Sequence, residues 1–234
     1  EYYQSIRKIG KNYGGRKSNN SLSSAKMRKA NKLRAVKHMQ RLINANFGSG
    51  DFFCRFSAPY GTYESEKKFR AEVGKWLDRI NYRLKKQGKG RLKYIAFIEC
   101  GKSGKNWHIH IIVSKEDREL LSEQWPYENG QNFTPLYKNE NFKKLAEYIT
   151  KDLTGKEDVD AAQKRMMTSR NLKKPESVTR KAKKREIRAL ERGEMIEPPE
   201  GHYLIEDDYS MNYSDIGGAK WYFCFLPITQ RRKW

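Results

Sequence analysis

The sequence predicts an α+β protein built on an antiparallel sheet. Two strand-like runs, 92–99 and 107–113, are separated only by the short loop 101–106, a pattern typical of a β-hairpin. A third run at 52–58 and later runs at 202–205 and 221–226 do not alternate regularly with helices. Strands of a doubly wound α/β fold would alternate in that way. We therefore expect an antiparallel sheet flanked by helices.

The helices are predicted from apolar residues that recur at spacings of three and four. Residues 24–45 show this periodicity beside a basic face, and residues 69–84 show it most clearly before an end near Gly88. A short helix is expected from Lys115, whereas 131–137 read as irregular or strand-like. The last helical patterns are an amphipathic one at 139–153 and a highly charged one at 173–195.

Composition along the chain predicts one domain preceded by an arm. Residues 1–24 are polar and basic, with Gly14-Gly15 and a Ser/Asn-rich stretch at 18–24, which is typical of a flexible segment. We expect residues 25–234 to form a single domain. Within it, a basic helical segment is expected around 175–195 and a C-terminal strand around 219–227.

The charge of the chain indicates a polyanionic partner. Its 234 residues include 49 Lys and Arg against 28 Asp and Glu, a formal net charge of +21. Such an excess costs self-repulsion in the folded state, so nucleic acid is the leading partner, before an anionic membrane surface or a merely well-solvated basic surface. The candidate nucleic-acid-binding residues are Arg28, Lys32, Arg34, Lys37, Arg55, Lys102, Lys105, Arg180, Lys184 and Arg188.

Several other classes of protein are disfavoured by the sequence. No apolar run approaches the roughly 20 residues that cross a bilayer, and no secretory leader is visible. Three scattered cysteines fit a reducing compartment, so we expect a cytoplasmic protein. Gly101-Lys102-Ser103 lacks the first glycine of a P-loop, because position 96 is Ala. No nucleotide cofactor is therefore expected.

Two of the four histidines, His108 and His110, lie in one strand-like run. Since side chains alternate along a strand, both imidazoles point to one face, about 7 Å apart, while Ile109 points to the other. The pair supplies two corners of a metal site. A single histidine in a strand is more often a polar group with satisfied hydrogen bonds, so the pair alone does not decide between these readings.

The hairpin adds a third ligand to this pair. If its loop is centred between Ser103 and Gly104, residue i pairs with residue 207 − i, which places Glu99 opposite His108. A slip of one residue would bring Cys100 to that face instead. Glu with two His suits Mn²⁺ or Mg²⁺, whereas Cys with two His favours zinc. We favour Glu99, because a hard carboxylate suits a metal that also binds phosphate oxygen.

The amphipathic segment 139–153 carries a candidate nucleophile. At 100° per residue, Tyr148 lies roughly 120° from the centre of the apolar stripe, and Lys151 stands beside it on the same side of the helix. A cation favours the phenolate form of a nearby tyrosine and stabilises developing phosphate charge. The alternative is a boundary tyrosine beside a surface lysine. The stripe consists of Phe142, Leu145, Ala146, Ile149 and Leu153.

Together these motifs resemble the His-hydrophobe-His (HUH) endonucleases. The resemblance rests on 107–112 (WHIHII), with Glu99 upstream and 148–151 (YITK) downstream. It is closest to the single-tyrosine replication initiators of bacterial plasmids and single-stranded DNA phages, in which a Tyr-x-x-Lys signature follows the histidines; relaxases of conjugation have the reverse order. Residues 52–58 are similar to the first motif strand of these initiators, with Cys54 and Arg55 where a Thr-rich version is usual, and 169–175 resemble a later segment.

The resemblance implies a fold and an activity. The fold is a central antiparallel sheet of about five strands flanked by helices, an RRM-like palm with the metal site on its central strands. The activity is nicking of a single-stranded DNA origin for rolling-circle replication, with Glu99, His108 and His110 as metal ligands, Tyr148 as nucleophile and Lys151 as its support. A helicase and a polymerase would be recruited. The alternatives are an HUH transposase or mobilisation relaxase, and a non-catalytic basic nucleic-acid-binding module.

Overall fold

The computed structural model describes residues 2–4, 25–101, 103–137, 141–151, 166–175, 183–205, 208–213 and 219–228. It divides the chain into two compact units, one of residues 25–175 and one of residues 176–234 together with 1–24. This division differs from the single domain expected over 25–234, and the boundary falls directly after Pro175.

The larger unit is built on a five-stranded antiparallel sheet with the order β5-β2-β4-β3-β6. An α+β architecture with such a sheet confirms the fold predicted from the sequence. The segment 131–137, read as irregular or strand-like, supplies the edge strand β5, and the other edge strand, β6, was not expected. The strands are β2 (Phe52–Ser57), β3 (Tyr94–Cys100), β4 (Trp107–Val113), β5 (Gln131–Pro135) and β6 (Met166–Thr168).

The hairpin of β3 and β4 has the predicted register. Its turn is closed by the Gly104 N–H, which donates to the Gly101 carbonyl at 2.9 Å, and Gly104 has a φ of +72°, a backbone conformation that favours glycine. Glu99 pairs with His108, and Cys100 pairs with Trp107. Since side chains alternate along a strand, Cys100 points to the face opposite Glu99, which removes it from the histidine face.

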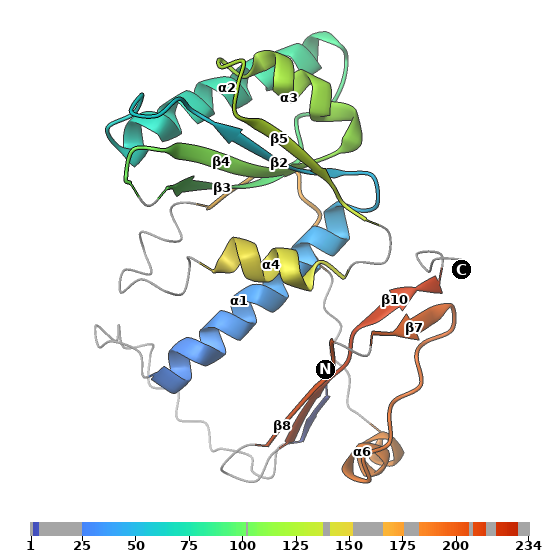
Figure 1. Ribbon diagram of the computed structural model, residues 1–234. Helices are drawn as coiled ribbons and strands as arrows, with labels where there is room; N and C mark the ends of the chain where they lie inside the picture. The colour runs from blue at the N-terminus through green and yellow to red at the C-terminus, as the bar shows by residue number, and fades with distance from the viewer. Residues whose placement is uncertain are drawn as a thin grey trace, which may run out of the picture. The chain divides into compact units, whose positions relative to one another are not determined.

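One face of the sheet is covered by α2 (Glu66–Lys86) and α3 (Arg118–Gln124), which follows the short 3₁₀ helix η1 (Lys115–Asp117) (Figure 1). The helix α2 begins after Ser65, whose hydroxyl accepts a hydrogen bond from the Lys68 N–H. Its apolar stripe packs with Ile109 and Ile111 of β4 in one continuous core. The buried stripe is the predicted one: Phe69, Val73, Trp76, Leu77, Ile80 and Leu84.

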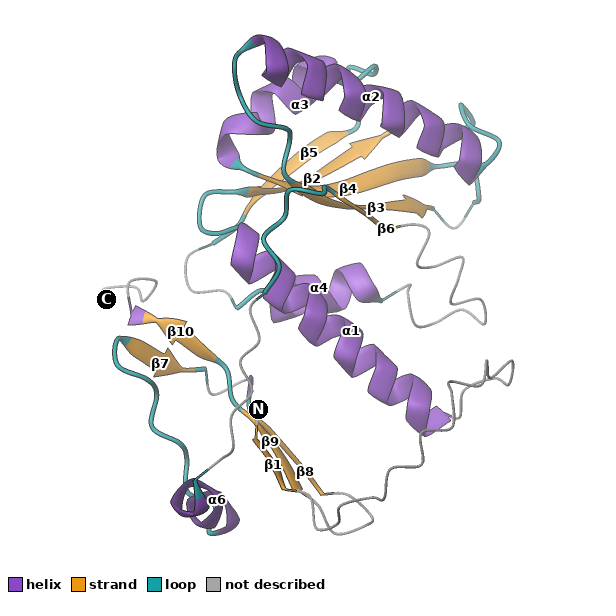
Figure 2. Ribbon diagram, turned by 180° about the vertical axis from the view of Figure 1, so that it is seen from behind, coloured by secondary structure: helices purple, strands orange, loops and turns teal. Residues whose placement is uncertain are grey.

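The opposite face is covered by α1 (Ala25–Asn46) and α4 (Lys143–Thr150), as the view from behind also shows (Figure 2). Val36, Met39 and Ile43 of α1 form a second core with Ala146 and Ile149 of α4. From the central strands this core takes Ile95 of β3 and Ile112 of β4. His108 and His110 lie on the same face as Ile112 but outside this core, toward the start of β4.

The smaller unit contains α6 (Lys184–Glu191) and two small sheets. In the first, β1 (Tyr2–Gln4), β9 (Ala219–Tyr222) and β8 (Ser210–Tyr213) lie in the order β1-β9-β8. In the second, β7 (His202–Leu204) pairs with β10 (Phe225–Pro227). The expected arm 1–24 thus begins with a strand, and the described late strands pair among themselves and with β1, which explains the separate unit.

None of the helices that the structure describes is both long enough and apolar enough to cross a membrane.

Gly130 fixes the edge strand β5 against β2. Its φ is +83°, its carbonyl accepts from the Ser57 N–H at 2.9 Å, and an added Cβ would lie 3.0 Å from Ser57 Cβ. We expect Gly130→Ala to lower the free energy of unfolding by about 1–3 kcal/mol, because it combines backbone strain with a close contact. Urea denaturation followed by circular dichroism measures this.

Gly90→Ala is the matched control, since a Cβ there meets nothing within 4 Å and no positive φ is involved. Its effect is expected to stay within about 0.5 kcal/mol. Equal stabilities of the two variants would contradict the account of the β2–β5 junction.

Candidate metal centre

Glu99, His108 and His110 converge at one point of the sheet. Glu99 Oε2 lies 3.2 Å from His108 Nε2 and 3.1 Å from His110 Nε2. The potential ligand atoms of the three residues lie within 4.8 Å of one another. Glu99 reaches the two histidines from the neighbouring strand because β3 and β4 hold it in direct register with His108.

The spacing of these donor atoms fits a bound cation. Two ligand atoms that are each about 2.1 Å from an ion, at an angle near 95°, lie about 3.1 Å apart. The Nδ1–H of His108 can donate to the Asn106 carbonyl, 3.3 Å away, which leaves the lone pair of Nε2 directed at a carboxylate that also only accepts. A cation between them satisfies both groups.

His110 is held in the form that binds metals. Burial, together with the neighbouring His108, lowers the pKa of His110 to about 4, although Glu99 acts in the opposite direction. The imidazole is therefore neutral near pH 7, and a neutral imidazole supplies a lone pair to an ion. Its Nδ1 is buried and has no hydrogen-bond partner in the part of the chain that the structure describes.

Aromatic rings fix the orientation of this imidazole. The His110 ring is nearly parallel to the ring of Phe97, with centroids 4.7 Å apart and an interplanar angle of 13°. It is also nearly parallel to Phe53, at 5.3 Å and 7°. These separations lie in the range of offset stacking. Sequence reasoning missed both phenylalanines, although their alternate positions in β3 and β2 place them on the histidine face.

Tyr148 approaches the same point from α4. Its Oη lies 3.4 Å from His110 Nε2, and its ring meets the His110 ring edge-on, with centroids 5.6 Å apart at 81°. The side chain is 43% exposed, so a strand of nucleic acid can reach it. The three metal-centre residues and Tyr148 therefore form one cluster, although they come from three different elements.

The start of α4 is clamped to α1. The Asn141 carbonyl accepts hydrogen bonds from Gln40 Nε2 and from Asn44 Nδ2, each at 3.0 Å, and Gln40 is only 2% exposed. The Asn141 side chain accepts from the Lys143 N–H at 3.1 Å. Phe142 between them has a φ of +53° and is buried, so packing holds a conformation that a non-glycine residue seldom adopts. The clamp fixes where the helix of Tyr148 begins.

The basic residues predicted from the sequence lie in several places. Lys151 is exposed at the C-cap of α4, Arg55 is exposed on β2, and Lys105 is exposed in the hairpin loop. On α1, Lys32 and Arg34 are exposed and Lys37 is half-buried, while Lys184 and Arg188 are exposed on α6 of the smaller unit. Arg28 belongs to α1, but its side chain lies outside the described part of the chain, as do the residues Lys102 and Arg180.

Comparison with known proteins assigns the region that holds this cluster. Residues 61–157 match a family model of replication-associated proteins, described as Replication-associated protein ORF2. The match includes all three candidate ligands, Tyr148 and Lys151. The resemblance to the rolling-circle replication initiators is confirmed. Neither the comparison with curated proteins nor that with solved structures gave a match.

Loss of a candidate ligand should weaken metal binding. We expect His108→Ala and Glu99→Gln each to raise the dissociation constant for Mn²⁺ by more than about 100-fold, because each removes one of only three convergent donors. Isothermal titration calorimetry measures this constant. His38→Ala is the matched control, since His38 is exposed on α1, and it should bind Mn²⁺ like the unchanged protein. Equal weakening in the control would contradict the assignment.

Proposed function

We propose that this chain is a replication initiator endonuclease that nicks a specific single-stranded DNA origin through Tyr148 and a divalent metal ion. The product would be a 5′-phosphotyrosine and a free 3′-hydroxyl, from which a polymerase starts rolling-circle replication. The observation that carries the proposal is the position of Tyr148 Oη, 3.4 Å from His110 Nε2 in the Glu99-His108-His110 cluster. The match to a replication-associated family supports it.

In this proposal Glu99, His108 and His110 hold Mn²⁺ or Mg²⁺. When bound, the ion would polarise the scissile phosphate and neutralise part of its charge. Three protein ligands leave positions of the coordination sphere for phosphate oxygen. The neutral His110 and the carboxylate of Glu99 suit such an ion, and the register that directs Cys100 away supports a hard metal instead of zinc.

Tyr148 is the nucleophile in the proposed reaction. Its oxygen forms a bond to phosphorus while the bond from phosphorus to the 3′ oxygen breaks, so the strand becomes covalently attached through its 5′ phosphate. The phenol proton passes to solvent, and the 3′ oxygen takes up a proton. Because the phosphotyrosine is again a phosphodiester, the reverse reaction rejoins strands without a nucleotide cofactor. Lys151 would stabilise charge near the phosphate or on the tyrosine.

The basic residues support the proposed DNA partner. With a net charge of +21, the protein should bind nucleic-acid backbones in a salt-dependent manner. Arg55 is exposed on β2 and pairs with His110 across the sheet, which places a cation beside the cluster. The basic helices α1 and α6 would add backbone contacts. A cytoplasmic helicase and polymerase would complete replication.

Tyr148→Phe tests the nucleophile directly. The protein is incubated with a panel of single-stranded oligonucleotides and Mn²⁺, and covalent adducts are detected on a denaturing gel. We expect the adduct to disappear in Tyr148→Phe, because phenylalanine has no attacking oxygen, while binding of the oligonucleotides changes by less than about threefold.

Tyr137→Phe is the matched control, since Tyr137 is also exposed, at 52%, and it should form the adduct normally. An adduct that persists in Tyr148→Phe would show that another residue is the nucleophile. Tight binding of the panel without any adduct in the unchanged protein would favour a non-catalytic nucleic-acid-binding module.

A further inference from the structure

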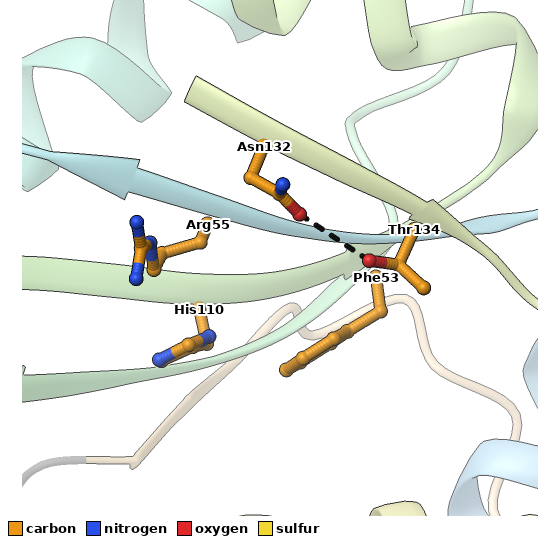
Figure 3. A pocket seen from close by; sticks show the side chains of 5 residues that line it. All are labelled: Phe53, Arg55, His110, Asn132 and Thr134. Atoms are coloured by element: carbon orange, nitrogen blue, oxygen red, sulfur yellow. Dashed lines mark hydrogen bonds between the residues drawn. The ribbon is translucent and has the colours of Figure 1, made fainter. Parts of the chain in front are cut away.

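A small pocket lies beside the candidate metal centre on the same face of the sheet. Its volume is about 240 Å³, and it is lined by Phe53, Arg55, His110, Asn132 and Thr134 (Figure 3). Volumes of pockets for drug-sized ligands start at about 300 Å³, so this pocket has room for a single small ring system.

The strand register explains why these residues meet. Arg55 of β2 pairs with His110 of β4 on one side and with Asn132 of β5 on the other, so the three side chains form a row across the sheet. Phe53 and Thr134 form the adjacent pair two residues along. The second core of the larger unit includes Ile112 but not His110, which leaves this row accessible.

The lining combines the groups that recognise an unstacked nucleobase. Phe53 and His110 supply aromatic surface, on which bases stack. Asn132 supplies an amide, and the Thr134 hydroxyl can donate to Asn132 Oδ1 at 3.3 Å (Figure 3). That contact leaves both N–H groups and the second lone pair of Oδ1 for a ligand. The exposed guanidinium of Arg55 can contact a phosphate.

We propose that this pocket binds one unstacked base of the DNA strand next to the scissile phosphate, and that Asn132 reads the edge of that base. The inference rests on the proposed function, because it takes the phosphate to bind at the metal centre. His110 belongs to both sites, so the base and the phosphate belong to adjacent parts of the strand. Adenine is the expected base, since an Asn amide pairs with its amino group and a ring nitrogen.

The assignment separates two kinds of contact. Arg55 contacts the backbone, so it adds affinity for every sequence, whereas Asn132 distinguishes one base from another. A pocket that binds only phosphate would contribute affinity without any preference for a base. The two possibilities therefore predict different results for the Asn132 and Arg55 variants.

The test uses a library of single-stranded oligonucleotides with randomised bases. Covalent adducts with the full chain are isolated in the presence of Mn²⁺, and the bases on both sides of the nick are sequenced. The unchanged protein should prefer one base at one position flanking the nick. In Asn132→Ala that preference should fall by about 10- to 100-fold, while preferences at other positions persist.

Two further variants serve as controls. Asn129→Ala removes an exposed asparagine outside the pocket lining and should retain the preference. Arg55→Gln should weaken binding of all sequences and reduce the slope of log K against log salt by about 0.7, without altering the preferred base. If Asn132→Ala keeps the same preference at every position, the pocket does not read a base and the proposal is overturned.

Failure of the proposed function gives a different result. In that case the unchanged protein forms no adduct, and the same library is selected for binding instead of cleavage. A base preference among the bound strands that is lost in Asn132→Ala would still support the pocket as a base-binding site. An unchanged preference in the bound strands would overturn it.

Discussion

The pairing of β3 with β4 is the constraint on which the site depends. In this register Glu99 faces His108, and the two-residue period of a strand brings His110 to the same face. A shift of one residue would replace the carboxylate by the thiol of Cys100 and turn the carboxylate into the α2 core. The glycine turn at Gly104 and the buried isoleucines on the opposite face of β4 oppose such a shift. Folding of the hairpin and assembly of the site are therefore one event.

The two faces of the sheet serve different purposes. The face under α2 and α3 is a closed aromatic and aliphatic core, in which Phe56, Trp76 and Trp125 are in ring contact. The other face is covered by α1 and α4 only over the part that includes Ile95 and Ile112, and the polar part beyond it carries the candidate site. The clamp at Asn141 decides where α4 begins, and so where Tyr148 meets His110. Stability and chemistry thus depend on the same helix.

Sequence patterns predicted those parts whose periodicity is strong. The stripe of α2, the central hairpin and its register follow from apolar spacing and one short loop, and they led to Glu99, His108 and His110. The edge strands were harder. The polar β5 and the three-residue β6 depend on pairing with distant partners, and no local pattern indicates those partners. For the same reason the short late strands did not reveal that they form a separate unit, and the left-handed Phe142 depends on contacts with α1.

The central claim is that one metal ion joins β3, β4 and α4 at a single point. Crystals grown with Mn²⁺ and measured at a wavelength where manganese scatters anomalously would locate the ion. The account predicts one strong peak about 2.0–2.3 Å from Nε2 of His108, Nε2 of His110 and a carboxylate oxygen of Glu99, with the hydroxyl of Tyr148 directed at it. A peak bound by other residues, or a Tyr148 side chain turned away from an ion in this place, would contradict it.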